Sequence, residues 1–298
     1  MKIKSWISAL RLRTLPLSLS CILIGGALAH PIQPINPIIF SLIIATTVIL
    51  QILSNLANDY GDGIKGTDDH RSGPDRMIQK GFISKKEMFL AICLLAVSAF
   101  LLGLILLYKV FGLDYLIISF LFLILGVFAI WAAIKYTMGE NPYGYKAMGD
   151  LFVFIFFGLV GVIGTYYLLT SSFNWITILG TLFTGCLSMS VLNMNNMRDH
   201  DSDKKAGKVT LVVKYGLKWA SNYQIILIII SSISIILIAY QYNEYIYYLC
   251  LLPLPILISN IRKVISYNQL IELDKELKKI ALSTFTISLI FFVITMLK

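Results

Sequence analysis

Long stretches without charge dominate this sequence. Nine hydrophobic segments alternate with polar links along its 298 residues. An uncharged run of about 20 residues is typical of a membrane-spanning helix, because a helix of that length crosses the hydrocarbon core of a bilayer. The segments cover roughly residues 14–30, 37–57, 88–108, 113–134, 150–170, 174–193, 219–240, 244–261 and 280–297. We therefore predict an all-α membrane protein with nine transmembrane helices.

The composition supports a polytopic membrane protein and excludes a soluble domain. Hydrophobic residues make up 57% of the chain, charged residues only 14%, and the mean hydropathy is +0.79. Neither a separate soluble domain nor a low-complexity tract interrupts the pattern, so residues 1–298 are expected to form a single domain. The first segment has no small-residue cleavage site before the next polar loop, which predicts a retained helix and not a signal peptide.

The basic residues predict the orientation of the helices. Of the 25 lysines and arginines, all but Lys109 and Lys298 lie before the first segment or in the links that follow even-numbered segments. Cytoplasmic loops are rich in Lys and Arg, so the N-terminus is expected in the cytoplasm and the C-terminus outside. This distribution also explains the net charge of +9 better than nucleic-acid binding does.

Acidic residues gather in two short stretches, one after the second segment and one after the sixth. In the first stretch, Asn58 and Asp62 are four residues apart and share a face if the helix continues. In the second, Asn195, Asp199 and Asp203 repeat this spacing and form one polar stripe if the segment is helical. The two stretches therefore match in register and in their predicted membrane side.

The position of these acids makes a bound cation the expected partner. Both stretches follow the C-terminal ends of helices, where the helix dipole disfavours carboxylates. Crowded carboxylates near a membrane also lose solvation and repel one another. Oxygen ligands without His or Cys favour Mg²⁺, which usually keeps part of its coordination shell for water and substrate phosphate. The acids therefore predict a magnesium-bound, phosphorylated substrate.

Basic residues interleaved with the acids suit a diphosphate group. Lys65, Arg76 and Lys80 accompany the first stretch, and Arg198 and Lys208 accompany the second. Arginine forks and lysine point charges are common phosphate ligands. Charged loops of membrane proteins are often only solvated faces, and orientation alone explains each basic residue equally well. The agreement between two matched acidic stretches is what favours a site.

The two acidic stretches, NDYGDGIKGTD and NMNNMRDHDSD, resemble the signature motifs of the UbiA superfamily of intramembrane prenyltransferases. That family has an NDxxDxxxD motif after helix 2 and a DxxxD motif after helix 6, on nine helices. In this sequence Asp68 comes two residues later than the last aspartate of the first motif, and Gly66 occupies the usual position. The stretches NPYGYKAMGDLFVFIFFG and NNMRDHDSDKKAGKVTL resemble the branch that prenylates 1,4-dihydroxy-2-naphthoate in menaquinone synthesis.

The resemblance implies a substrate, a cofactor and a set of site residues. Two Mg²⁺ ions would clamp a polyprenyl diphosphate, and the aromatic carbon that bears the carboxylate would attack the allylic cation with loss of CO₂. The metal ligands implied are Asn58, Asp59, Asp62, Asp68, Asn195, Asp199 and Asp203. The diphosphate partners implied are Arg13, Lys65, Arg76, Lys80, Arg198 and Lys208. Tyr143 would stabilise the cation through its ring, and Asp62, Asp199 and Asp203 would be catalytic.

Three alternatives stay open at this point. Another UbiA-type enzyme would prenylate 4-hydroxybenzoate or a haem or chlorophyll precursor. A CDP-alcohol phosphotransferase also binds metal through spaced aspartates, but its DG-x-x-AR core is absent from this sequence. A cation-coupled transporter would place ionisable groups near mid-membrane, whereas these acids lie at the predicted cytoplasmic rim. We expect a multi-pass protein of the cytoplasmic membrane whose active site faces the cytoplasm.

Overall fold

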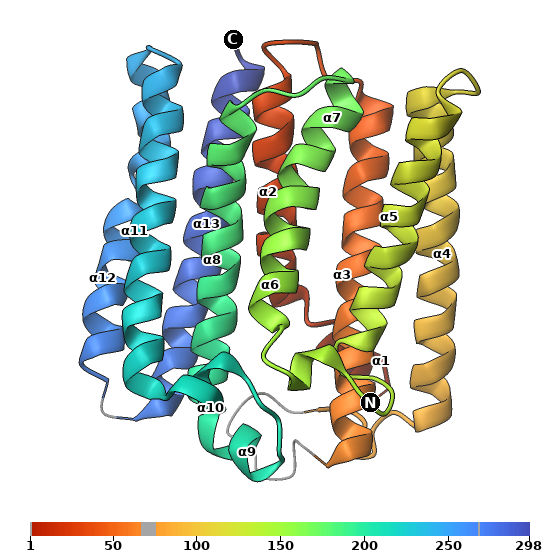
Figure 1. The fold of residues 1–298 in the computed structure, drawn as a ribbon, viewed down its shortest axis with the longest axis vertical. Helices are drawn as coiled ribbons and strands as arrows, with labels where there is room; N and C mark the ends of the chain where they lie inside the picture. The colour runs from red at the N-terminus through yellow and green to blue at the C-terminus, as the bar shows by residue number, and fades with distance from the viewer. Residues whose placement is uncertain (1, 67–75, 268) are drawn as a thin grey trace. The chain divides into compact units, whose positions relative to one another are not determined.

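The computed structural model describes residues 2–66, 76–267 and 269–298, and most of these residues are helical (Figure 1). Within them, nine helical stretches are long and apolar enough to cross a membrane. The predicted all-helical class and the nine spans are therefore confirmed for the described part of the chain. Asp68, an expected metal ligand, lies outside the described residues.

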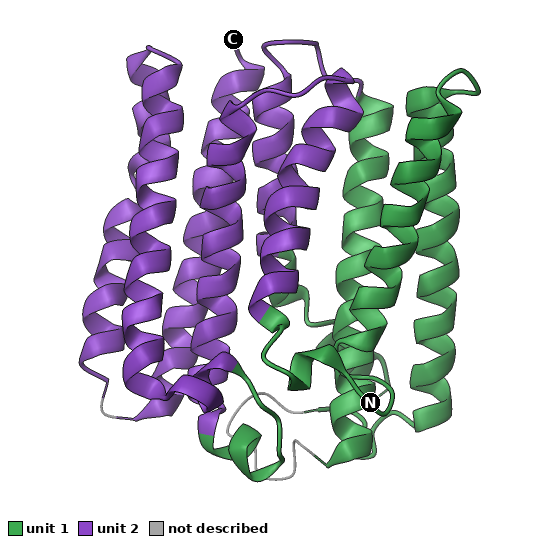
Figure 2. Ribbon diagram, viewed as in Figure 1, with its two compact units in different colours: residues 1–15, 37–149, 201–210 green, residues 16–36, 150–200, 211–298 purple. Residues whose placement is uncertain are grey.

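The chain divides into two compact units (Figure 2). Unit 1 comprises residues 1–15, 37–149 and 201–210, and unit 2 comprises residues 16–36, 150–200 and 211–298. The first unit thus includes a short segment from the second acidic stretch. The expectation of a single domain stays a prediction.

Unit 1 is built around one long helix that carries the first acidic stretch. Its helices are α1 (Lys2–Leu10), α3 (Pro37–Lys65), α4 (Lys85–Phe111) and α5 (Leu116–Lys135). Helix α3 packs against the other three. It extends eight residues beyond the predicted segment 37–57, because hydropathy detects only the apolar part of a helix. Asn58 and Asp62 therefore lie one turn apart on α3, as their spacing predicts.

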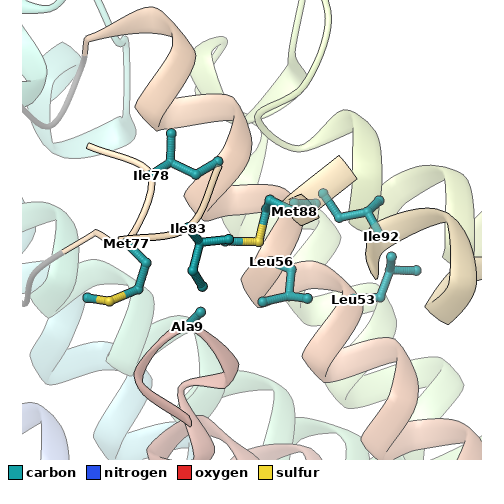
Figure 3. Close-up of a cluster of buried hydrophobic side chains, with 9 residues drawn as sticks. Ala9, Leu53, Leu56, Met77, Ile78, Ile83, Met88 and Ile92 are labelled. Atoms are coloured by element: carbon teal, nitrogen blue, oxygen red, sulfur yellow. The ribbon is translucent and has the colours of Figure 1, made fainter. Parts of the chain in front are cut away.

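A buried hydrophobic cluster fixes the end of the loop between α3 and α4, residues 77–83, against these helices (Figure 3). Met77, Ile78 and Ile83 project from the loop and gather with Ala9 of α1 and Leu56 of α3. All five side chains are at most 8% exposed. Burial of this much apolar surface stabilises the loop by several kcal/mol, at about 1.5–3 kcal/mol for each large side chain. Arg76, the residue before Met77, is consequently held near the end of α3.

The start of α4 is fixed by a capping box. The Ser84 side chain accepts a hydrogen bond from the Glu87 amide, and the Glu87 carboxylate accepts one from the Ser84 amide at 3.0 Å. This reciprocal pair satisfies amides that have no partner within the helix. The segment that carries Met77, Ile78 and Ile83 is therefore fixed both by burial and by the start of α4.

A close approach at Gly61 of α3 gives a testable prediction. A Cβ at Gly61 would lie 2.7 Å from both the carbonyl carbon and the Cβ of Thr137. We expect Gly61→Ala to destabilise the protein by about 1–3 kcal/mol, because backbone must move to relieve the overlap. Thermal unfolding in detergent measures the effect. Gly126→Ala on α5 is the control, since a Cβ there meets nothing within 4 Å; equal stability of the two variants would contradict the prediction.

Unit 2 surrounds helix α8 (Ile176–Arg198). Helix α8 packs against α11 (Leu217–Gln241), α13 (Leu273–Met296) and the π-helical segment η3 (Phe154–Gly164). Small residues allow these close approaches: a Cβ at Gly158 of η3 would stand 3.1 Å from the Thr181 carbonyl oxygen of α8. Such contacts are typical of helices that pack in a membrane. The remaining α-helices of the unit are α2 (Leu15–Ala29), α6 (Gly149–Val153), α7 (Thr165–Thr170), α10 (Leu211–Tyr215) and α12 (Leu254–Ile265).

Two elements differ from the sequence-based expectations. The eighth span begins as a 3₁₀ helix, η4 (Tyr245–Leu251), and becomes α-helical only at Leu254. Pro253 and Pro255 lack amide protons, which explains the break. In addition, α8 ends at Arg198, Asp199 has φ −93° and ψ 9°, and α9 (His200–Lys205) begins afterwards. The single continuous stripe expected for Asn195, Asp199 and Asp203 is therefore wrong.

Candidate active site

Asp62, in the last turn of α3, accepts two strong hydrogen bonds. Arg76 Nη2 donates to its Oδ2 at 2.8 Å, and the Tyr145 hydroxyl donates to its Oδ1 at 2.8 Å. The side chains of Arg76 and Asp62 are 5% and 4% exposed. Charge-assisted bonds of this kind are short and about twice as strong as neutral ones. The carboxylate is therefore held in one orientation by two segments outside its own helix.

The residues that precede Asp62 are fixed by other segments. Asp59 accepts the backbone amides of Met77 at 3.0 Å and Ile78 at 3.2 Å. The Thr137 hydroxyl lies 2.9 Å from the Ala57 carbonyl oxygen and 3.3 Å from Asn58 Oδ1. Asp59 thus holds Met77 and Ile78 in place, and each of its two oxygens already accepts one backbone amide. Asn58 is only partly buried and keeps its amide oxygen near the end of α3.

Tyr145 is a site residue that the sequence analysis missed. Its hydroxyl donates to Asp62, and its ring lies beside two lysines. Lys65 Nζ is 4.5 Å and Lys208 Nζ is 5.6 Å from the ring centroid. Cations at these distances are attracted to the negative face of the ring. Tyr145 lies in the 3₁₀ turn η2 (Tyr143–Tyr145). Its spacing in NPYGYK does not distinguish it from Tyr143, so only the fold identifies it.

The second acidic stretch reaches Tyr145 through a short backbone pairing. The Ala147 amide donates to the Val209 carbonyl at 2.7 Å, and the Val209 amide donates to the Tyr145 carbonyl at 3.2 Å. Lys208, next in the chain, lies with Nζ 3.4 Å from Asp203 Oδ1. Asp62 and Asp203, which are far apart in the sequence, are thereby joined through Tyr145 and Lys208 within unit 1.

We call this group the Asp62–Asp203 cluster. Its members are Asp62, Lys65, Arg76, Tyr145, Asp203 and Lys208. The cluster combines two buried carboxylates with three basic groups. A polyanion entering it would compete with the carboxylates for Lys65, Arg76 and Lys208, and a divalent cation would compete with the basic groups for the carboxylates. Such a cluster suits the simultaneous binding of both.

Asn195 and Asp199 lie in unit 2 and form a separate arrangement around Arg198. The guanidinium donates from Nε and Nη2 to the two oxygens of Asp199, at 2.8 and 2.7 Å. Nη2 also donates to Asn195 Oδ1 at 2.7 Å, and Nη1 donates to Asp274 Oδ1 of α13 at 2.6 Å. The Arg198 side chain is fully buried. Arg198 thus orients Asn195 and Asp199 in this structure.

The other expected residues lie in three different settings. Tyr143 is partly buried, donates its hydroxyl to the Ala132 carbonyl at 2.8 Å, and places its ring 6.2 Å from that of Trp131. Burial raises the pKa of Tyr143 well above its usual range, so only its neutral ring is available to a cation. Arg13 lies in the turn η1 (Leu12–Thr14), and Lys80 lies in the chain between Ile78 and Ile83; both Arg13 and Lys80 are exposed.

The carboxylates suit Mg²⁺ by chemistry, although they do not form a complete cage. Asp62 and Asp203 offer hard oxygen ligands at buried positions, and Mg²⁺ favours such ligands. Within residues 2–66, 76–267 and 269–298, three or more acids, histidines or cysteines do not gather at one metal-sized site. A magnesium ion bound here would complete its shell with amide, water or phosphate oxygens, as Mg²⁺ commonly does.

A family profile and the most similar curated proteins reported below indicate the same family. The sequence profile of the UbiA prenyltransferase family matches residues 18–290. The chain is 40% identical to 1,4-dihydroxy-2-naphthoate octaprenyltransferase of Haemophilus influenzae, over 97% of this chain and 95% of that protein. It is also 40% identical to the protein of that name from Escherichia coli, over 88% of this chain and 85% of the relative.

Solved structures share the fold at low sequence identity. A UbiA homolog from Aeropyrum pernix matches with a TM-score of 0.72 and 15% identity, covering 95% of this chain and 98% of that one. A UbiA homolog from Archaeoglobus fulgidus, bound to GPP and Mg²⁺, matches with a TM-score of 0.68 and 14% identity. It covers 99% of this chain and 100% of that one.

Proposed function

The chain belongs to the UbiA prenyltransferase family, and from this premise we propose that it transfers a polyprenyl group to 1,4-dihydroxy-2-naphthoate. The donor is polyprenyl diphosphate, and the reaction releases diphosphate and CO₂ to give demethylmenaquinol. The family resemblance predicted from the two acidic motifs is confirmed. The choice of acceptor rests on one observation, the 40% identity to a naphthoate octaprenyltransferase along 97% of the chain.

The Asp62–Asp203 cluster supports binding of the diphosphate end of the donor. Lys65, Arg76 and Lys208 supply positive charge beside the two carboxylates. Magnesium would neutralise the diphosphate and favour its departure. Its proposed ligands are Asn58, Asp59, Asp62, Asp68, Asn195, Asp199 and Asp203. Two ions are proposed, and the Archaeoglobus fulgidus homolog bound to GPP and Mg²⁺ supports this use of magnesium.

The residues of the chain have distinct parts in cleavage of the allylic C–O bond. Arg76 and the two lysines stabilise negative charge as it develops on the leaving diphosphate, which is usually the largest contribution to such catalysis. The Tyr145 hydroxyl keeps Asp62 oriented toward the cluster. Tyr143 presents a neutral ring that stabilises positive charge on the allyl group through its π face. Arg13 and Lys80 are exposed and are proposed to contact the diphosphate as it enters.

We also propose the orientation in the membrane. The cytoplasmic face carries the N-terminus and the active site, and the C-terminus lies outside. This proposal is supported by the distribution of 25 basic residues, all but two of which fall on the predicted cytoplasmic side. The protein is accordingly placed in the cytoplasmic membrane, where the prenyl chain of the donor stays in the bilayer.

Release of the carboxylate tests the proposed acceptor. Membranes that contain the protein are supplied with Mg²⁺, a polyprenyl diphosphate and dihydroxynaphthoate labelled in its carboxylate. We expect labelled CO₂ in equal amount to the prenylated product, because the prenyl group replaces the carboxylate. Membranes with the Asp62→Asn variant give the background. Prenylation of 4-hydroxybenzoate without release of labelled CO₂ would reject this acceptor.

A further inference from the structure

The turn that follows α1 contains a residue in a strained backbone conformation. Helix α1 ends at Leu10, Arg11 has φ 47° and ψ 52°, and the chain continues through η1 (Leu12–Thr14). A non-glycine residue rarely adopts this left-handed conformation, because its Cβ then lies too close to a carbonyl oxygen. Such conformations persist where the surrounding structure fixes them. The contacts that fix this turn, which carries Arg13, are therefore of interest.

Asn55 of α3 holds the turn from outside. Its side-chain amide donates one hydrogen bond to the Leu10 carbonyl and a second to the Thr14 hydroxyl, both at 2.9 Å. Gln51, one turn earlier on α3, donates to the same hydroxyl at 3.2 Å and to Asn55 Oδ1 at 3.3 Å. The Thr14 hydroxyl donates in turn to the Arg11 carbonyl at 3.0 Å. Asn55 is only 4% exposed, so its amide is shielded from water.

This network requires an amide side chain at position 55. The two N–H groups of Asn55 serve Leu10 and Thr14, and its oxygen accepts from Gln51. An ionised aspartate could not donate either bond, and a serine has a single donor. The Leu10 carbonyl belongs to the last turn of α1, where carbonyls lack partners within the helix. Asn55 therefore caps α1 and holds η1 at the same time.

The face of α3 that carries Asn55 also carries the first acidic stretch. Its members Asn58, Asp59 and Asp62 come three, four and seven residues after Asn55. These spacings put side chains on one side of a helix. The seven residues to Asp62 correspond to about 10 Å along the helix axis. The turn after α1 is thus attached to α3 one turn before the acidic stretch and on the same face.

A second contact holds α1 beside Arg76. Ala9 of α1 packs in the buried cluster of Figure 3, which includes Met77. Met77 follows Arg76, whose guanidinium donates to Asp62 at 2.8 Å. One apolar contact before the turn and one polar network within it therefore keep Arg13 beside the acidic end of α3.

We propose that Asn55 is a positioning residue for the prenyl donor: by holding the turn after α1, it keeps Arg13 where this arginine meets the diphosphate. This inference rests on the proposed function, in which Arg13 contacts the diphosphate. Asn55 itself touches neither substrate nor metal. Without its two hydrogen bonds, the strained turn relaxes and Arg13 loses its fixed position relative to Asp62. Affinity then falls, because more of the turn must be ordered when the diphosphate binds.

Binding of inorganic diphosphate in the presence of Mg²⁺ tests this role without turnover. We expect Asn55→Leu to weaken the affinity about tenfold, as loss of a hydrogen bond to a charged group does. Thr14→Val removes the hydroxyl that Asn55 and Gln51 share, and it should weaken the affinity about threefold or more. Thr14→Ser keeps that hydroxyl and should bind like the wild type.

The matched control for these variants is Thr46→Val. Thr46 lies on α3, as Asn55 does, but its hydroxyl donates to the Leu42 carbonyl of the same helix at 2.8 Å. The change therefore removes a buried hydroxyl from α3 without touching the turn after α1. Thr46→Val should bind diphosphate like the wild type. A loss equal to that of Thr14→Val would contradict the role of the turn.

A double-mutant cycle with Arg13 separates positioning from a general loss of structure. Arg13→Ala alone should weaken diphosphate binding about tenfold. In the Arg13→Ala background, Asn55→Leu should add less than about twofold, because the side chain that Asn55 positions is absent. Independent effects that multiply to about a hundredfold would overturn the inference. Wild-type affinity in Asn55→Leu would overturn it as well.

Turnover gives a second readout that a merely structural role would not produce. Asn55→Leu should raise the KM for prenyl diphosphate about tenfold and change kcat less than about threefold, since a contact made before and during the reaction affects binding uniformly. The KM for the naphthoate should stay within about twofold of the wild type. A fall in kcat with an unchanged KM for prenyl diphosphate would contradict the proposed role.

The outcomes for Asn55 and for the proposed function can be told apart. If the wild type releases labelled CO₂ and Asn55→Leu binds diphosphate as tightly, the inference fails and the function stands. If no CO₂ is released but the coupling between Asn55 and Arg13 persists, the proposed acceptor fails and the inference stands. A wild type that does not bind diphosphate would reject both. If Asn55→Leu does not fold, Thr14→Val takes its place in the cycle with Arg13→Ala and decides the inference.

Discussion

Replacing Asp62 by asparagine is expected to lower turnover about a thousandfold without preventing insertion into the membrane. Asparagine keeps the shape of the side chain but loses the charge that pairs with Arg76 and that a metal ion would require. Loss of one preorganised charge-stabilising group typically costs 10²–10³-fold in rate. Because Asp62 serves both the metal and the ion pair in our proposal, we expect the upper end of that range.

The measurement is the rate of prenylated product formation in purified protein, with the thermal midpoint recorded in parallel. Asp114→Asn is the matched control, since Asp114 is an exposed aspartate in the loop between α4 and α5. Tyr145→Phe, which removes only the hydroxyl that donates to Asp62, should fall between them at about tenfold. Near-normal turnover by Asp62→Asn would contradict the role of the Asp62–Asp203 cluster.

A readout that does not depend on turnover is the response to magnesium itself. The wild type should gain thermal stability as Mg²⁺ is added together with diphosphate, because a ligand that binds only the folded state stabilises it. Asp62→Asn should lose most of this gain, and Asp114→Asn should keep it. Equal gains in all three proteins would place the metal elsewhere.

The sequence predicts the spans well because membrane helices are specified by a single strong property. A run of apolar residues long enough to cross the bilayer has few alternatives, since its backbone must satisfy its own hydrogen bonds. Hydropathy does not report where polar residues continue a helix, however. Helix α3 therefore runs on to Lys65, and Asp59 and Asp62 find partners in the loop that follows this helix, 18 and 14 residues further along the chain.

The site was predictable to the extent that it depends on local spacing. The four-residue spacing of Asn58 and Asp62 predicts one helix face, and α3 carries both. Tyr145 was not predictable, because its contacts with Asp62 and Lys208 depend on a backbone pairing with residue 209. The turn at Asp199 was also missed, since its side chain pairs with the adjacent Arg198 at the end of α8.

The contacts of Arg198 in the structure differ from the diphosphate contact that the sequence predicts. As a diphosphate ligand, Arg198 could be replaced with loss of donor affinity and little loss of stability. In the structure, its guanidinium instead joins Asp199, Asn195 and Asp274. Removal of one partner from a buried ion pair typically costs about 3–5 kcal/mol, because the remaining charge stays buried and uncompensated.

We therefore expect Arg198→Leu to lower the free energy of unfolding by about 3–5 kcal/mol. Arg198→Lys should lose less, since it keeps the charge but lacks the planar fork that bridges three acceptors. The control is Arg262→Leu, which changes an exposed arginine in the last turn of α12. Unfolding is followed in detergent without substrate or metal, so that ligand binding does not contribute. Equal stability of Arg198→Leu and Arg262→Leu, with a loss only of affinity for prenyl diphosphate, would contradict this prediction. Arg198 would then be a substrate ligand, and its contact with Asp274 would not contribute to the free energy of unfolding.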